Sequence, residues 1–210
     1  NLPYLRYLGK LNKKIILSTG MSTLSEIKEA TKVLTNNGTN QKNISILHAS
    51  TIYPTPIHNV NLRAMLTIKN HLNFPVGYSD HTIGIEVSNA AVAMGASIIE
   101  KHFTLDRSMD GPDHQASLEP KELESMVNSI RNIELALGSD RKFPSKVEVA
   151  NSLLARKSIH AKKIIKKGDC FSSDNIIVKR PGIGISPMKW DSVMGMVAKK
   201  DFEKDELISL

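Results

Sequence analysis

The sequence predicts an α/β protein with a parallel sheet, followed by a smaller β-rich domain. Over residues 1–139, short apolar runs alternate with longer segments whose apolar residues recur at the 3.6-residue period of a helix. Hydrophobic strands that alternate with helices are typical of parallel sheets covered by helices. After residue 152 the pattern changes to short β-branched runs separated by turns that contain glycine. These two patterns indicate two domains of different classes.

The first strand–helix unit has the clearest signals. The run Ile15–Leu17 predicts a buried strand. Thr23 and Glu26 have the spacing of a capping box, which predicts that a helix begins between them. Asn37-Gly38 supplies the residue types that end helices.

Three further units follow the same order of strand and helix. The apolar runs predict strands at residues 44–48, around residue 76 and at residues 97–99, and helices at about 62–69, 85–94 and 120–137. The last helix has Pro120 in its first turn and Gly138 at its end, the positions these residues favour. Residues 1–139 therefore contain four strand–helix units.

The number of units indicates half of an eight-stranded barrel. A TIM (β/α)8 barrel needs eight such units and about 250 residues, roughly twice what this region supplies. The chain begins at Asn1 without an initiator Met, on what resembles the end of a helix. We therefore expect residues 1–139 to be the carboxyl-terminal half of a TIM barrel, with its amino-terminal half missing from this sequence.

The last third of the chain differs in charge as well as in pattern. Residues 140–152 are polar and contain Pro144, and we interpret them as a linker to a domain at residues 153–210. That domain carries 12 Lys and Arg against 7 Asp and Glu, so most of the net charge of +7 lies there. A solvated basic surface is the default explanation and attraction of an anionic substrate the second. Binding of nucleic acid is a distant third, because the basic residues are scattered. The apolar runs predict strands at 158–160, 164–165, 176–178 and 193–197.

Composition excludes a membrane protein and a disulfide-stabilised one. Hydrophobic residues make up 40% of the chain, and no apolar run approaches the roughly 18 residues of a membrane span. Cys170 is the single cysteine, so an internal disulfide is excluded, which fits a reducing cytoplasm. We expect Cys170 to be a half-buried small hydrophobe rather than a nucleophile.

Two histidines follow neighbouring predicted strands. His81 comes after the third strand and His102 after the fourth, with Asp80 and Glu100 beside them. Ligands bind at the carboxyl ends of parallel strands, and neighbouring strands lie about 4.8 Å apart. Either histidine alone is more often a hydrogen-bonded structural residue, but the pair at adjacent strand ends favours a shared divalent metal ion.

Other polar residues at this edge are less specific. Ser18 precedes a helix N-terminus, where backbone N–H groups can bind phosphate, although turn chemistry explains it equally well. Ser79 would add a second hydroxyl. Tyr53 belongs to a stiff loop with two prolines that can lie over the strand ends, and Asp113, beside His114 in a Gly-Pro turn, is weak evidence in isolation.

Several short motifs occur in order along the chain: Ser-Thr-Gly-Met (18–21), Tyr-Pro-Thr-Pro (53–56), Gly-Tyr-Ser-Asp-His-Thr (77–82), Glu-Lys-His-Phe-Thr-Leu-Asp (100–106), Gly-Pro-Asp-His (111–114), Ser-Leu-Glu-Pro (117–120) and Arg-Pro-Gly-Ile-Gly-Ile-Ser-Pro (180–187). Together they resemble the motifs of the sialic acid synthases, which are phosphoenolpyruvate-dependent nonulosonic acid synthases. The last motif resembles the family's carboxyl-terminal antifreeze-like SAF domain, a small β-clip fold. The resemblance extends over essentially the whole chain.

The resemblance implies a metal-dependent transferase that forms a carbon–carbon bond. Such an enzyme joins phosphoenolpyruvate to an open-chain N-acetylated hexose, either N-acetylmannosamine or a related diacetamido sugar, and releases phosphate. His81 and His102 would bind Mn²⁺, or Mg²⁺ or Co²⁺ in its place, and the metal would polarise the aldehyde oxygen. Asp113 would contact the sugar hydroxyls or metal-bound water, and we count it with the two histidines as catalytic.

The resemblance also implies the substrate contacts and the assembly. Ser18 and Ser79 would hold phosphoenolpyruvate, with Tyr53 nearby. Arg180 would reach from the SAF domain into the partner subunit's active site in a domain-swapped homodimer and bind the sugar's N-acyl group. The product would enter cell-surface polysaccharide biosynthesis. Because the family's amino-terminal barrel strands are absent from this sequence, we expect the chain alone to be inactive.

The alternative is a non-catalytic protein whose SAF domain binds carbohydrate or ice. A binding module has no need for two histidines, neighbouring acidic residues and two serines at successive strand ends, so we favour the enzyme. These residues do not distinguish the N-acetylneuraminic, legionaminic and pseudaminic acid pathways.

Overall fold

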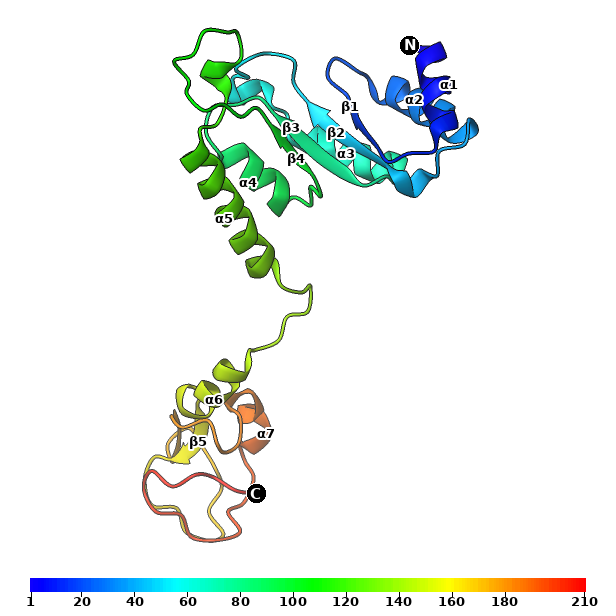
Figure 1. The fold of residues 1–210 in the computed structure, drawn as a ribbon. Helices are drawn as coiled ribbons and strands as arrows, with labels where there is room; N and C mark the ends of the chain where they lie inside the picture. The colour runs from blue at the N-terminus through cyan, green and yellow to red at the C-terminus, as the bar shows by residue number, and fades with distance from the viewer. The chain divides into compact units, whose positions relative to one another are not determined.

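A parallel four-stranded sheet in the order β1-β2-β3-β4 organises the first part of the chain, with helices between successive strands (Figure 1). This computed structural model describes residues 1–210, which divide into two units, Asn1–Gly138 and Ser139–Leu210. Sequential neighbours in a parallel sheet are what consecutive units of a (β/α)8 barrel form, and the expected fold class is confirmed. The elements of the first unit are α1 (Leu2–Leu11), β1 (Ile15–Ser18), α2 (Leu24–Asn36), β2 (Ile44–Ala49), α3 (Arg63–Leu72), β3 (Val76–Asp80), α4 (Glu86–Ala93), β4 (Ile99–Lys101) and α5 (Pro120–Leu137).

Local sequence signals set the helix ends as expected. The Thr23 side chain accepts a hydrogen bond from the Glu26 N–H at 3.3 Å, and the Glu26 carboxylate accepts one from the Thr23 N–H at 2.7 Å. This capping box begins α2. Pro120 lies in the first turn of α5, and Gly138, at φ +54°, ends it. A positive φ costs glycine little, because it has no Cβ.

The sheet presents different side chains on its two faces. On one face, apolar strand residues pack against the helices and form the core, which consists of Ile27, Leu34, Ile44, Ile46, Val60, Met65, Ile68, Val76, Tyr78 and Ala91. Side chains alternate along a strand, so Ser79 lies on the face opposite Tyr78. Ser79 is the register partner of Glu100. We call the face that carries Ser79 and Glu100 the site face.

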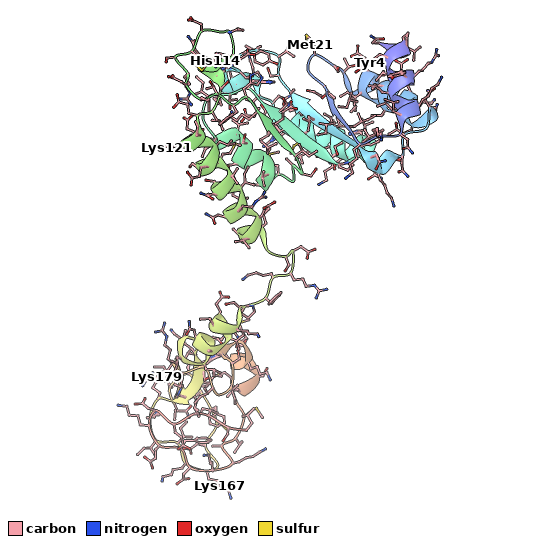
Figure 2. The ribbon with its side chains drawn as sticks, in the orientation of Figure 1. Tyr4, Met21, His114, Lys121, Lys167 and Lys179 are labelled. Carbon is pink, nitrogen blue, oxygen red and sulfur yellow. The ribbon has the colours of Figure 1, made fainter.

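The second unit is a small β-rich body. It contains α6 (Lys146–Ala155), β5 (Ser158–Ala161), β6 (Ile176–Lys179) and α7 (Trp190–Val193), and β5 pairs with β6 antiparallel. Its buried core consists of Ile159, Ala161, Ile165, Phe171, Ile176, Val193, Ala198, Phe202 and Ile208. Lys167 and Lys179 lie at the edge of this unit (Figure 2), and the Lys179 ammonium pairs with Asp205. In neither unit is any helix both long and apolar enough to cross a lipid bilayer.

The second unit differs from expectation in four places. Residues 164–165 do not form a strand, because Ile165 makes only an isolated bridge with Phe202. Residues 140–152 are not linker throughout, because Ser145 and Glu148 form a capping box that begins α6. Residues 193–197 do not form a strand. Val193 ends α7, and Val197 makes only an isolated bridge. Cys170, the other half of that bridge, is exposed rather than half-buried.

Candidate active site

Three rings meet at the carboxyl ends of β3 and β4. The ring centroids of His81 and His102 are 5.2 Å apart and nearly perpendicular. Tyr53, from the loop after β2, lies 4.2 Å from His81 and 5.5 Å from His102 by the same measure. The structure thus brings together the two histidines and the tyrosine that the sequence singled out.

A hydrogen bond fixes the orientation of the His81 ring. Its Nδ1 lies 2.7 Å from the carbonyl oxygen of Ser50, which can only accept, so Nδ1 carries the proton. The lone pair is therefore on Nε2, which lies 3.5 Å from the hydroxyl of Ser79. Burial lowers the pKa of His81 from its ordinary value, and this shift favours the neutral imidazole. A neutral ring with a free Nε2 is the form that binds metal ions.

Ser79 and Glu100 form a polar pair beside the histidines. The Ser79 hydroxyl donates to the Glu100 carboxylate at 2.7 Å, across the register that joins β3 to β4. The sequence pattern placed Glu100 beside the histidines without counting it as a site residue, although its position two residues before His102 puts it on the same face of the strand. That two-residue spacing is the signal that could have identified it.

Asp80 does not belong to this cluster. It lies on the helix-facing side, where its side chain is fully buried and its Oδ2 is 3.0 Å from Lys101 Nζ. From the sequence, we expected Asp80 to lie beside His81 in the same polar cluster. Alternation along the strand separates the two, because successive side chains point to opposite faces.

Asp113 approaches the site from the loop between β4 and α5. Its Oδ2 lies 3.7 Å from His102 Nδ1, and its side chain is exposed. A pocket of about 470 Å³ lies here, lined by His102, Phe103, Pro112, Asp113, His114 and Ser117. His114, labelled in Figure 2, is held by Thr104, whose hydroxyl lies 2.7 Å from its Nδ1. Asp113 therefore borders the histidine pair at the rim.

Ser18 lies on the site face, two strands from the histidines. It pairs in register with Leu47, which pairs in turn with Gly77, two residues before Ser79. Two strand spacings correspond to about 10 Å. Ser18 is exposed at the end of β1, and no hydrogen bond joins it to His81 or His102.

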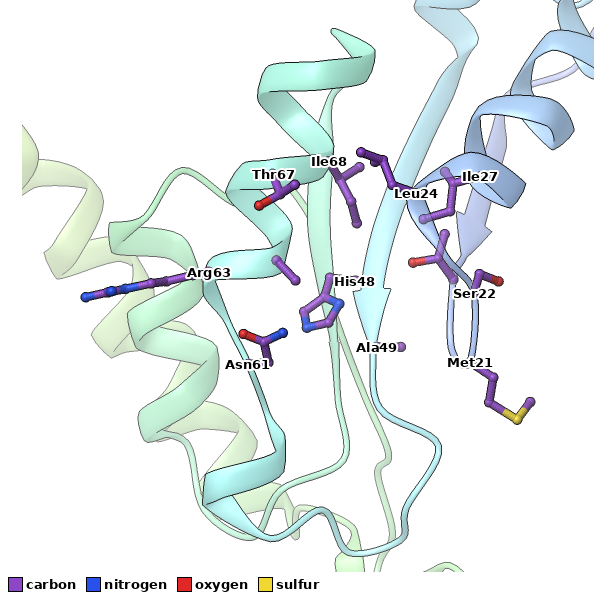
Figure 3. A pocket seen from close by; sticks show the side chains of 12 residues that line it. Met21, Ser22, Leu24, Ile27, His48, Ala49, Asn61, Arg63, Thr67 and Ile68 are labelled. Atoms are coloured by element: carbon purple, nitrogen blue, oxygen red, sulfur yellow. The ribbon is translucent and has the colours of Figure 1, made fainter.

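A separate pocket of about 430 Å³ lies between α2 and α3, on the helix side of the sheet (Figure 3). Thr19, Met21, Asn61 and His48 are among its lining residues, whereas Tyr53, His81 and His102 are not. His48 Nε2 lies 2.9 Å from the carbonyl of Val60, so this imidazole already has a structural partner. The pocket is well formed but carries none of the candidate chemistry.

Arg180 lies in the second unit, after β6. Its side chain is exposed, and its Nε donates to the carbonyl of Ala155 at 3.0 Å. None of the salt bridges in the structure includes it. The guanidinium thus lacks a carboxylate partner within the chain.

The side chains on the site face include two of the ligands that a divalent metal ion needs. The His81 and His102 rings lie 5.2 Å apart between centroids, and no group of three His, Cys, Asp or Glu side chains is arranged around a shared point. Two imidazoles, with other positions open to oxygen atoms of water or substrate, suit a first-row divalent ion.

Comparison with known proteins places the chain in a family. Residues 1–142 match the NeuB family model and residues 156–210 match the SAF domain model. The chain therefore belongs to the NeuB family, and its second unit contains a SAF domain. This confirms the resemblance that the sequence motifs indicated.

Named relatives agree with this placement. The chain is 54% identical to the N,N'-diacetyllegionaminic acid synthase of Campylobacter jejuni, over 99% of this chain and 62% of that protein. It is 42% identical to the synthase of the same name from Legionella pneumophila, over 93% of this chain and 55% of that protein. The crystal structure of an N-acetylneuraminic acid synthetase from Leptospira borgpetersenii superposes with a TM-score of 0.66 at 37% identity, covering 72% of this chain and 52% of that one. The chain thus spans less than two thirds of the relatives it matches.

Proposed function

We propose that the protein to which this chain belongs is a nonulosonic acid synthase. It would join phosphoenolpyruvate to an open-chain N-acetylated hexose and release phosphate. Membership of the NeuB family and the names of its relatives support this reaction class. The structural observation that carries the proposal is the convergence of His81, His102 and Tyr53 at the carboxyl ends of β3 and β4.

His81 and His102 would hold a divalent metal ion, Mn²⁺ or Mg²⁺ or Co²⁺ in its place. When bound, such an ion supplies Lewis-acid polarisation to the aldehyde oxygen of the sugar. His81 is prepared for this role by the Ser50 carbonyl, which holds the proton on Nδ1 and leaves Nε2 free. Asp113, at the rim 3.7 Å from His102, would orient the sugar hydroxyls or a water molecule.

The remaining residues would bind and orient the substrates. When phosphoenolpyruvate binds, Ser79 would turn its single hydroxyl proton from the Glu100 carboxylate, which accepts it at 2.7 Å here, to an oxygen of the substrate. Ser18, on the same face, would bind a more distant oxygen of the same substrate. Tyr53 packs against both imidazoles and would exclude water from one side of the site.

We propose a diacetamido hexose as the acceptor, with a legionaminic acid as the product. Two relatives named as N,N'-diacetyllegionaminic acid synthases, at 54% and 42% identity, support this choice over N-acetylmannosamine. A second acetamido group adds a donor and an acceptor that a matching site must pair, so an acceptor lacking it should be disfavoured.

We propose further that the site is completed by a second copy of the chain in a domain-swapped homodimer. Each of the four loops after the strands exposes a large apolar side chain: Met21, Ile57, Ile83 and Leu105, each more than 60% exposed. Apolar residues gathered at one edge of a sheet indicate that another surface covers them. Arg180, exposed and without a carboxylate partner, would reach the partner's sugar from the SAF domain.

The test is a coupled assay on the full-length protein with Mn²⁺ and phosphoenolpyruvate. Phosphate release and the mass of the nine-carbon product are measured with N-acetylmannosamine and with the diacetamido precursors of legionaminic and pseudaminic acid. We expect the highest kcat/KM with the legionaminic precursor and none above background for His102→Ala. If phosphate is released only when N-acetylmannosamine is the acceptor, the proposed diacetamido acceptor is wrong. If phosphate is released with none of the three sugars, the proposed reaction is wrong. The 210-residue chain alone should be inactive, because β1 and β4 are unpaired sheet edges.

A further inference from the structure

We propose that the buried ion pair between Asp80 and Lys101 is a positioning device that holds His81 and His102 at the spacing of a shared metal site. This inference rests on the proposed function, because it assigns the histidines to a metal. Neither member of the pair lies on the site face, and both would act through the residue that follows them in the chain.

Lys101 contacts the residues on either side of His81 in the chain. Its Nζ lies 3.0 Å from Asp80 Oδ2 and donates to the carbonyl of Thr82 at 2.7 Å, so it binds the residues before and after His81. Lys101 is itself the residue before His102. One ammonium group therefore connects the chain around one histidine to the chain that leads to the other.

Little else joins the two histidine backbones. The paired register of β3 and β4 ends at Asp80 and Lys101, one residue short of each histidine. Beyond that point the backbones bond elsewhere: the His81 carbonyl accepts from Thr55 N–H at 2.8 Å, and the His102 carbonyl from Leu118 N–H at 2.9 Å. The ion pair is thus the last direct connection before the two segments separate.

The pair is rigid as well as buried. The Lys101 and Asp80 side chains are 2% and 0% exposed. Thr82 donates to Asp80 Oδ1 from its N–H at 2.9 Å and from its hydroxyl at 2.7 Å, and the Ser88 hydroxyl donates to Oδ2 at 2.6 Å. A charge pair with this many fixed partners holds its atoms in one geometry. Fixed outer-shell partners of this kind orient metal ligands in other sites.

The experiment separates positioning from stability in the full-length protein. The main variant combines Asp80→Asn with Lys101→Met, which removes both charges together, since replacing a whole buried pair is tolerated far better than breaking it. Thr82→Val is a milder variant that removes one donor to Asp80 and keeps the pair. Leu34→Ala is the control, because Leu34 is fully buried in the same unit but belongs to α2.

Three quantities are measured: the melting temperature, the nuclear Overhauser effect between the His81 and His102 rings in the metal-free protein, and the dissociation constant for Mn²⁺. We expect the double variant to melt near the parent, to lose the inter-ring effect and to bind Mn²⁺ about 10-fold or more weakly. Thr82→Val should show a smaller loss of the inter-ring effect and of Mn²⁺ affinity. If the double variant fails to fold, the result for Thr82→Val decides whether the ion pair positions the histidines. Leu34→Ala should melt lower yet keep the inter-ring effect and the Mn²⁺ affinity.

The outcomes distinguish the two proposals. An inter-ring effect that persists in the double variant, with Mn²⁺ affinity within twofold of the parent, overturns the positioning role. An equal loss of Mn²⁺ affinity in Leu34→Ala overturns it as well, because general destabilisation would then explain the result. If the parent itself fails to bind Mn²⁺, the proposed metal role is wrong, and the inter-ring effect alone decides whether the ion pair sets the spacing.

Discussion

Gly77 is the position where one added methyl group should disturb both the fold and the site. It lies in β3 on the site face, two residues before Ser79. A Cβ there would lie 2.4 Å from the Ile98 carbonyl oxygen, 2.5 Å from Leu47 Cδ2 and 2.9 Å from Ile98 Cβ. The carbonyl cannot rotate away, so β3 and the segment before β4 must separate. Overpacking of a core costs about 1–3 kcal/mol, and a clash with backbone puts Gly77→Ala near 3 kcal/mol.

The measurement is urea unfolding of the full-length protein followed by circular dichroism. With a slope of about 2 kcal/mol/M, a loss near 3 kcal/mol lowers the midpoint by about 1.5 M. Gly20→Ala is the matched control. Its Cβ would also meet an atom at 2.5 Å, but that atom is the exposed Thr51 methyl group, which can turn aside. If Gly77→Ala shifts the midpoint no more than Gly20→Ala does, the reasoning from close approach is refuted.

Three further outcomes follow from the site. His102→Ala should abolish Mn²⁺ binding and turnover while the melting temperature stays within a few degrees, since the side chain is 31% exposed; activity without added metal would contradict the metal assignment. The ring of His81 should titrate below pH 6.5 in the metal-free protein, because burial lowers its pKa. Just below about pH 6.5 the folded state then binds fewer protons at His81 than the unfolded chain does. The contribution of His81 to the free energy of unfolding is therefore full above that pH and is lost as the pH falls. A His81 midpoint above pH 6.5 in an NMR titration would reverse this pH dependence. Arg180→Ala should raise the KM for the sugar more than it lowers kcat, and mixing it with His81→Ala should restore part of the activity; no recovery after subunit exchange would place Arg180 at its own barrel.

Local patterns in the sequence were enough to locate the helices and strands of the first unit and the candidate residues. Apolar periodicity and the capping box of Thr23 and Glu26 located the strands and helices of the first unit within a few residues, because these signals act between near neighbours in the chain. His81 and His102 were also located from near neighbours in the sequence, because each follows a predicted strand. The same approach missed α6 although Ser145 and Glu148 carry the signal, because a polar segment next to a proline also resembles a linker.

Which polar residues share a face of the sheet depends on contacts between strands that are distant in the sequence. His81 and Asp80 are adjacent in the chain, yet one meets His102 and Tyr53 while the other forms a buried pair with Lys101. The pairing of Ser79 with Glu100 depends on the register between β3 and β4. A shift of one residue would exchange the two faces. Register is set by packing between strands that lie about twenty residues apart in the sequence, so no local pattern contains it.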